Sequence, residues 1–415
     1  MTPTCNVPRA ANAPFPGRNV TLLFLALAIC VSTFGGDVAP LFNAKIEHEF
    51  PEGKAALEQV MALVLENYYS DTVDEQSLWW GAIEGVLRRL SPEENKALAA
   101  IWTPEDYGNV SQALKGVQES IGIKSSYNAG DGSLTVTEVL PGGPSVSLLL
   151  PYDRIVRIDG QPLKGLAVKE IDLLLKGEKG SRVSLKVIRD VAIFDLLVTR
   201  DQVKVENVQS ETLTANVGYI AIRKFSAGVS EEVKGKLEAL TKEKVERVIL
   251  DVRGNSGGVF NEGLKCAELF IPKGKSLMRM VSHGSKVNNY VSANEDAFAT
   301  LRIVVLMDKH SASASEILGA ALRDEMGATL VGTGTYGKAT MERIYTLDNT
   351  FRVKFTNAAL YSPKGKSWQK TGLLPDFPAT QDLELANKLR KLKPEQRLAK
   401  DGQLRLAHRV LLKIK

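Results

Sequence analysis

The chain has 415 residues, of which 44% are hydrophobic and 24% are charged. This composition is ordinary for a globular protein and excludes wholesale disorder, and the length allows two or three domains whose cores need no disulfide bonds. The net charge of +5 is too small to imply a nucleic-acid partner, and the four histidines have no metal-ligand spacing, so we expect neither nucleic acid, metal ion nor cofactor.

Residues 1–36 have the pattern of a targeting signal. Two arginines precede an apolar run from Val20 to Val31, and small residues follow the run. A membrane-spanning helix needs about 20 apolar residues, so the run fits a secretory signal better. The sequence predicts a signal peptide or an uncleaved membrane anchor, and an extracytoplasmic protein, periplasmic or secreted. Cleavage would leave Cys266, predicted to be a core residue, as the one remaining cysteine.

Helical spacing of apolar residues continues from 54 to about 102, and Ser91-Pro-Glu-Glu is typical of a helix start. After Tyr107 the pattern changes to short strands separated by Gly, Pro and Asp turns, with one helix near 167–175. The strands expected in this second region are 122–124, 134–139, 154–158 and 183–188.

From about 202 to 379 strands and helices alternate, which indicates an α/β domain. The expected strands are 217–222, 248–252 and 303–307, and the expected helices are 230–240, 261–269 and 312–326. A basic helical tail ends the chain, and we expect its charges to form a solvated face rather than an anion site.

Small residues surround Ser313 in the run Ser311-Ala-Ser-Ala-Ser-Glu316, at the expected start of a helix. The amides and the dipole at a helix amino terminus favour developing negative charge, and the two flanking alanines would leave the hydroxyl uncovered. The same string is a capping box between Ser313 and Glu316, which would be purely structural. A serine also needs a neighbouring base before it acts as a nucleophile.

Lys338, in the glycine-rich segment after this helix, is our candidate for that base. A free lysine has a pKa of about 10.4, so burial among apolar groups would have to lower the pKa by about 3 units for work near neutrality. The turn at 254–258 follows a strand and can aim backbone amides at one point, as an oxyanion hole requires. The alternative base is His310. The Gly332–Gly337 string matches a dinucleotide fingerprint but leads into a strand, which argues against that function.

Several motifs, in order, resemble those of the carboxyl-terminal processing, or tail-specific, proteases, which are secreted serine–lysine peptidases with an inserted PDZ domain. The resemblance extends from about residue 64 to the end of the chain. The matching strings are Ser120-Ile-Gly-Ile123, Asp251-Val-Arg-Gly-Asn-Ser-Gly-Gly258, Ser311–Glu316, Gly337-Lys338 and Thr371-Gly-Leu-Leu-Pro-Asp376.

The resemblance implies an α/β multidomain protein with a ClpP/crotonase-like α/β protease core, an inserted PDZ domain and helical N- and C-terminal arms. The implied parts are the N-terminal arm at 37–110, the PDZ domain at 111–201, the serine protease core at 202–380 and the C-terminal helical tail at 381–415. The helical ends suggest a homodimer, and the N-terminal segment suggests membrane association.

By the same resemblance, Ser313 attacks the scissile carbonyl and Lys338 is the general base. The backbone amides of Ala314 and Gly257, or of Gly258, would hold the oxyanion. The PDZ segment would bind the free carboxyl terminus of a protein or peptide substrate by strand addition. The implied PDZ residues are Ser120, Ile121, Gly122 and Ile123.

Two departures from the family pattern qualify this expectation. The PDZ segment at 142–150 is shorter than usual, and Glu342 stands where the family usually has a glutamine that orients the lysine. A carboxylate about 4 Å from the ammonium favours the charged lysine by about 4 kcal/mol at an effective dielectric near 20. Glu342 must therefore be protonated, turned away or the cause of an alkaline optimum, and we expect the last or a slow enzyme. A catalytically impaired PDZ scaffold and a small-molecule hydrolase are the alternatives.

Overall fold

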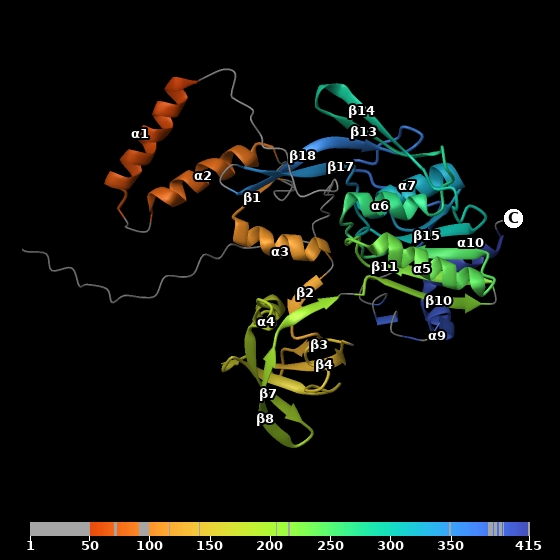
Figure 1. The fold of residues 1–415 in the computed structure, drawn as a ribbon, viewed down its shortest axis with the longest axis horizontal. Helices are drawn as coiled ribbons and strands as arrows, with labels where there is room; N and C mark the ends of the chain where they lie inside the picture. The colour runs from red at the N-terminus through yellow and green to blue at the C-terminus, as the bar shows by residue number, and fades with distance from the viewer. Residues whose placement is uncertain are drawn as a thin grey trace, which may run out of the picture.

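The computed structural model describes residues 50–413 except 70–72, 91–98, 116, 141, 205, 215, 348–349 and most of 381–393. The expected targeting segment and the expected helix start at Ser91 lie outside the described residues. Figure 1 shows a large mixed body, a separate small β-rich body connected to it near β2, and two helices that project from one end.

A six-stranded sheet forms the centre of the large body, in the order β10-β11-β12-β15-β16-β19. The strands are β10 (Val208–Thr214), β11 (Val217–Ile222), β12 (Arg247–Asp251), β15 (Arg302–Met307), β16 (Thr329–Gly332) and β19 (Phe377–Pro378). Only the pair β10–β11 is antiparallel. The inner strands are almost continuous apolar runs, as expected where helices cover both faces of a parallel sheet.

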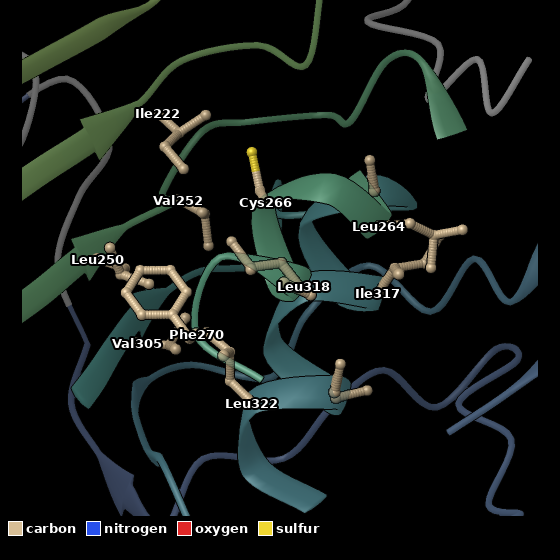
Figure 2. Close-up of a cluster of buried hydrophobic side chains, with 14 of the residues drawn as sticks. Ile222, Leu250, Val252, Leu264, Cys266, Phe270, Val305, Ile317, Leu318 and Leu322 are labelled. Carbon is tan, nitrogen blue, oxygen red and sulfur yellow. The ribbon is translucent and has the colours of Figure 1, made fainter. Parts of the chain in front are cut away.

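Helices cover both faces of this sheet. On one face are α5 (Val229–Lys242), α6 (Phe260–Glu268) and α7 (Ala314–Met326), and on the other is α10 (Gly402–Lys413), which follows α9 (Pro394–Lys400). Figure 2 shows apolar residues of α6 and α7 together with those of the strands in one buried cluster. Cys266 belongs to that cluster and is fully buried, which confirms the prediction of a core cysteine.

A second, antiparallel sheet lies beside α6 and α7. It consists of β1 (Ala100–Trp102), β13 (Ser276–Ser282), β14 (Lys286–Val291), β17 (Thr340–Thr346) and β18 (Arg352–Tyr361). The strand β18 pairs with three others, and a short 3-10 turn at His283–Ser285 connects β13 to β14.

The small body is a separate sheet with its own core. Its strands are β3 (Ile123–Asn128), β4 (Ser133–Val139), β5 (Arg154–Ile158), β6 (Gln161–Pro162), β7 (Arg182–Arg189) and β8 (Ala192–Thr199), and its helix is α4 (Val168–Leu175). The chain enters along β2 (Val117–Ser120) and leaves along β9 (Asp201–Lys204), and these two strands pair with each other. This body is therefore an insertion into the larger one. Residues 142–148 form turns within it and no helix.

The N-terminal arm contains α1 (Pro51–Asn67), α2 (Glu75–Arg88) and α3 (Pro104–Lys115). The expectation of an all-helical arm is wrong for Ala100–Trp102, which form β1 and pair with β18. The cause is tertiary, because hydrogen bonds to a distant strand override the local helical spacing. No described helix combines the length and apolar character needed to cross a bilayer.

A buried ionic network connects the C-terminal helices to the central sheet. Arg253, at the end of β12, donates to Asp251 at 2.8 and 3.0 Å and to Asp401 at 2.9 Å, and all three side chains are at most 1% exposed. Tyr219 donates to the same Asp251 carboxylate at 2.6 Å. Burial opposes the charge on Arg253, but Asp251 and Asp401 outweigh it and raise the pKa of the guanidinium well above its ordinary value.

Removing Arg253 should strongly destabilise the fold, because two buried carboxylates would lose their counter-ion. We expect Arg253→Met to lower the free energy of unfolding by about 3–5 kcal/mol in urea titrations. The control is Arg302→Met, which removes an exposed arginine at the start of β15 and should change stability by less than about 0.5 kcal/mol. Equal unfolding midpoints for Arg253→Met and the parent would contradict the importance of this network.

Candidate active site

Three loops of the large body meet at one edge of the central sheet. They follow β12, β15 and β16, which are parallel neighbours, with Asp251 paired to Leu306 and Leu306 to Val331. Because the carboxyl ends of parallel strands lie at the same edge, the loops at 252–259, 308–313 and 333–339 converge there. The glycine turn, Ser313 and Lys338 predicted from the sequence are on these three loops, one on each.

Ser313 is the N-cap residue of α7 and has a strained backbone, with φ 57° and ψ −112°. Few residues other than glycine adopt such angles, and about 1–3 kcal/mol must be supplied by the surroundings. The expectation of an uncovered hydroxyl is wrong: Ser313 is 0% exposed. Its Oγ has no hydrogen-bond partner in the described part of the chain, neither Lys338 nor the exposed His310.

Gly257 explains why Ser313 is covered. Its backbone, at φ 97°, passes so close that a Cβ atom would lie 2.9 Å from Ser313 Cβ and 2.8 Å from the Ala312 carbonyl oxygen. Both the positive φ and the lack of space therefore require glycine. The glycine turn lies directly over the serine, where an oxyanion hole has to be.

The Gly257 amide itself is not available in this arrangement, contrary to the sequence-based expectation. It donates to the Asn255 side-chain oxygen at 2.8 Å. Asn255 is in turn held through its carbonyl oxygen by the Ala312 amide at 3.0 Å and the Ser315 hydroxyl at 2.8 Å. The other two expected donors are Gly258, next in the turn, and Ala314, whose amide at the first residue of α7 has no intrahelical acceptor.

Glu316 connects Ser313 to Lys338. One of its carboxylate oxygens accepts from the Ser313 amide at 2.8 Å and the Lys338 amide at 2.9 Å, and the other accepts from the Gly337 amide and the Thr335 hydroxyl. Because both amides donate to the same oxygen atom, the backbone nitrogens of Ser313 and Lys338 lie close together. Burial raises the pKa of the Glu316 carboxyl, although its hydrogen bonds act in the opposite direction.

The capping box expected from the sequence is only half formed. Glu316 accepts from the Ser313 amide, but the Ser313 hydroxyl makes no return hydrogen bond. The capping interpretation and the nucleophile interpretation are therefore compatible, because the cap uses the backbone of Ser313 and leaves its Oγ unused.

Lys338 is 4% exposed, and its amine lies 2.5 Å from a carboxylate oxygen of the fully buried Glu342. The pairing of β17 with β18 is irregular between Met341 and Glu342, and both of these residues are buried. A bulge of this kind re-aims a side chain, here bringing Glu342 toward Lys338. Glu342 is thus not turned away, and its carboxylate forms a buried ion pair with the Lys338 amine.

The backbone of Lys338 is fixed by a segment far along the chain. The Trp368 indole nitrogen donates to the Lys338 carbonyl oxygen at 3.1 Å, and the Ala339 amide donates to the Gln369 side chain at 2.7 Å. Lys338 can therefore move its side chain without moving its main chain.

Sequence reasoning missed a second buried lysine near the site. Lys354, on β18, is 1% exposed, and its amine lies 5.7 Å from the centre of the Trp102 ring. Burial lowers the pKa of Lys354 to about 8; the Lys338 charge also lowers it, and the Glu342 charge opposes the shift. No local signal marked this residue, because a lysine in an alternating strand usually faces solvent.

The predicted peptide-binding residues lie in the inserted sheet. Ser120 accepts from the Gly122 amide at 3.3 Å, Ile121 is 1% exposed within the core of the insertion, and Gly122 has a φ of 73°. Ile123 then begins β3, an edge strand that pairs with β4 alone among the described strands. The free edge of β3 can accept an added strand.

The chain was compared with known proteins. The sequence model described as peptidase family S41 matches residues 216–379, and the PDZ domain model matches residues 111–188. The carboxy-terminal processing protease CtpA of Bacillus subtilis is 31% identical over 336 residues, which cover 80% of this chain and 69% of that protein. The chain belongs to peptidase family S41.

Two further matches agree with this family. The carboxyl-terminal-processing protease of Synechocystis is 28% identical over 377 residues, covering 86% of this chain and 88% of that protein. The solved structure of a candidate S41 protease from Bacteroides fragilis superposes with a TM-score of 0.56 at 17% identity, covering 91% of this chain and 99% of the other. The predicted family and fold class are confirmed, and this S41 chain is a serine-type peptidase with a PDZ domain that binds peptide.

Gly257→Ala tests the close approach over Ser313. The added methyl group would have to displace Ser313 or the turn, so we expect a loss of stability of about 1–3 kcal/mol and a large loss of peptidase activity. The matched control is Gly235→Ala in α5, where a Cβ meets nothing within 4 Å and alanine favours the helix. Thermal unfolding and peptide cleavage should be measured together; a fully active Gly257→Ala protein would refute the geometry.

Proposed function

We propose that this S41 peptidase cleaves proteins whose free carboxyl termini its PDZ domain binds, with Ser313 as the nucleophile and Lys338 as the general base. The observation that best supports this proposal is that one oxygen of the Glu316 carboxylate accepts hydrogen bonds from the amides of both Ser313 and Lys338. Two main-chain segments are held together there although 25 positions separate them in sequence.

In the first step, the Ser313 Oγ attacks the scissile carbonyl carbon while its proton passes to the neutral Lys338 amine. The tetrahedral oxyanion is held by the amides of Ala314 and Gly258. Collapse breaks the peptide bond, and the lysine gives the proton to the leaving amine, so that an acyl-enzyme remains. Water then repeats the sequence and releases the acyl product.

This mechanism requires a change at Lys338. Its amine must leave Glu342 and face the serine, and it must be neutral when it does so. The unpaired Ser313 Oγ and the Lys338–Glu342 contact describe a resting arrangement in which the base is held by a carboxylate. A resting state of this kind limits indiscriminate cleavage, and substrate entry would then supply the rearrangement.

Recognition of the substrate tail follows from the edge of β3. A peptide that adds to this edge continues the sheet with main-chain hydrogen bonds. The loop at 121–122 lies between β2 and the edge strand and would receive the terminal carboxylate on its backbone amides, with the Gly122 amide leaving the Ser120 hydroxyl to do so. A tail with a blocked carboxyl group would lose that interaction.

The test is cleavage of an unstructured polypeptide with an apolar carboxyl end, compared with the same polypeptide carrying a terminal amide. We expect the parent to cleave the free acid faster and the Ser313→Ala protein to cleave neither. Fluorescence anisotropy should show that Ser313→Ala still binds the free acid more tightly than the amide. Cleavage by Ser313→Ala, or no preference for the free acid, would contradict the proposal.

Replacing Glu342 tests the control of the base. Glu342→Gln removes the charge that favours the Lys338 ammonium, so deprotonation should occur at lower pH and kcat/KM near pH 7 should rise by about tenfold. The measurement is kcat/KM from about pH 6 to pH 10 for both proteins. An unchanged pH profile would mean that the Glu342 charge does not act on the base.

We extend the proposal to location and assembly. The basic and apolar pattern of residues 1–36 supports export or membrane association, and exposed apolar side chains along α1 support a homodimer. Cell fractionation with sequencing of the mature N-terminus tests export, and a full-length cytosolic chain would refute it.

Sedimentation tests assembly. The substitution Leu63→Lys, on an α1 residue that is 60% exposed, should give a monomer.

A further inference from the structure

We propose that Lys354 is a positioning residue for the catalytic base: it supplies the positive charge that Glu342 requires, so that Lys338 can face Ser313 as a neutral amine. This inference rests on the proposed serine–lysine mechanism. It gives the buried lysine of β18 a role that neither the motifs nor the fold assigns.

Strand register places Lys354 next to Glu342. In the β17–β18 ladder Glu342 is opposite Thr356 and Ile344 is opposite Lys354. Side chains two residues apart on a strand share a face, so Lys354 is the diagonal cross-strand neighbour of Glu342. Diagonal positions are about 7–8 Å apart at the backbone, which a lysine side chain can span.

The other edge of β18 stabilises the charged form of Lys354. There Ala100 of β1 is opposite Lys354, and Trp102 is the diagonal neighbour. The Lys354 amine lies 5.7 Å from the centre of the Trp102 ring, a distance at which the face of an indole attracts a cation. Lys354 thus lies between an aromatic face on one neighbouring strand and a carboxylate on the other.

The other charged groups on the surrounding strands and helix are engaged elsewhere. Arg343 of β17 lies over the Tyr345 ring, and Arg352 of β18 lies over the Tyr107 ring. In α3, Asp106 accepts from the Thr103 hydroxyl, and Lys115 at the far end is exposed. The described charges that act on Lys354 are those of Glu342 and Lys338.

The cluster around Lys354 therefore contains one carboxylate, that of Glu342, and two amines. The nearby Glu316 carboxylate is not counted, because the Ser313, Gly337 and Lys338 amides and the Thr335 hydroxyl already donate to it. Charge neutrality inside the protein needs one proton on the two amines together, because a second would leave an uncompensated buried charge. When Lys338 carries this proton, its ammonium group stays paired with the Glu342 carboxylate, and Lys338 cannot act as a base. When Lys354 carries it, Glu342 keeps a counter-ion and Lys338 is free to turn to Ser313.

The burial of Lys354 is consistent with this exchange. Its pKa of about 8 means that the amine gains or loses its proton close to neutral pH rather than near 10.5. The active form is produced only when the proton leaves Lys338 while Lys354 keeps its own. Activity should accordingly rise with pH as Lys338 loses its proton, for as long as Lys354 stays charged.

Lys354→Met tests the proposal. Without Lys354, Lys338 becomes the one cation for Glu342, so the rising limb of the kcat/KM profile should move to higher pH by about 1–2 units. At pH 7 this is a loss of about 10–100-fold, and activity should return toward the parent value at alkaline pH. The control is Lys286→Met, which removes an exposed lysine of β14 in the same sheet and should leave the profile unchanged.

Two further variants separate charge from structure. Lys354→Arg keeps a cation beside Glu342 and should keep the parent profile. The double variant Glu342→Gln with Lys354→Met has no carboxylate to neutralise, so activity at pH 7 should recover to at least the parent level. A purely structural role for Lys354 predicts the opposite, namely a loss at every pH that Glu342→Gln does not rescue.

The outcomes also distinguish this inference from the proposed function. If the parent cleaves and Ser313→Ala does not, but Lys354→Met has the parent pH profile, the role of Lys354 is refuted and the dyad stands. If the Ser313→Ala protein cleaves as well as the parent, the dyad itself is refuted. Circular dichroism of every variant shows whether a lost activity reflects a lost fold.

Discussion

The site depends on one buried carboxylate, that of Glu316. It accepts hydrogen bonds from the helix start that carries Ser313 and from the loop that carries Lys338, and so joins two segments that no strand pairing connects. A charged acceptor bonded to backbone amides is among the stronger interactions available inside a protein. It holds Ser313 in a backbone conformation that an isolated chain would rarely adopt.

Around this anchor the protein buries three further ionisable side chains. Lys338, Glu342 and Lys354 are each at most 4% exposed, and replacing such groups by apolar ones often stabilises a protein. Their retention is easier to explain by proton chemistry than by folding. The network around Arg253 is different, because both carboxylates accept hydrogen bonds from the same guanidinium group. This network connects the C-terminal helices to the sheet.

The inserted PDZ domain and the peptidase body have separate apolar cores and are joined through the paired strands β2 and β9. The helix α3 leads directly into β2 and packs through Val110 and Leu114 against Val259, the residue after the glycine turn. The fold thus places α3, which precedes the insertion, in contact with the segment that covers Ser313.

Local sequence determined the elements that depend on near neighbours. The apolar runs from Val217, Val248 and Ile303 identified the inner strands, and helical periodicity located α5, α6 and α7 to within two residues at either end. Ser313 and Lys338 were predicted as the catalytic pair from motifs, because the proposed chemistry needs those residue types on small-residue loops. Glu342 was recognised as a departure for the same reason.

Tertiary structure decided the features that depend on residues far apart in the chain. The burial of Ser313 results from the approach of Gly257, and the use of the Gly257 amide by Asn255 depends on how that turn folds over the helix start. The burial of Lys354 depends on β1 and β17 flanking its strand. Periodicity cannot show such contacts, because the residue pattern of a strand is the same whether or not other strands flank it.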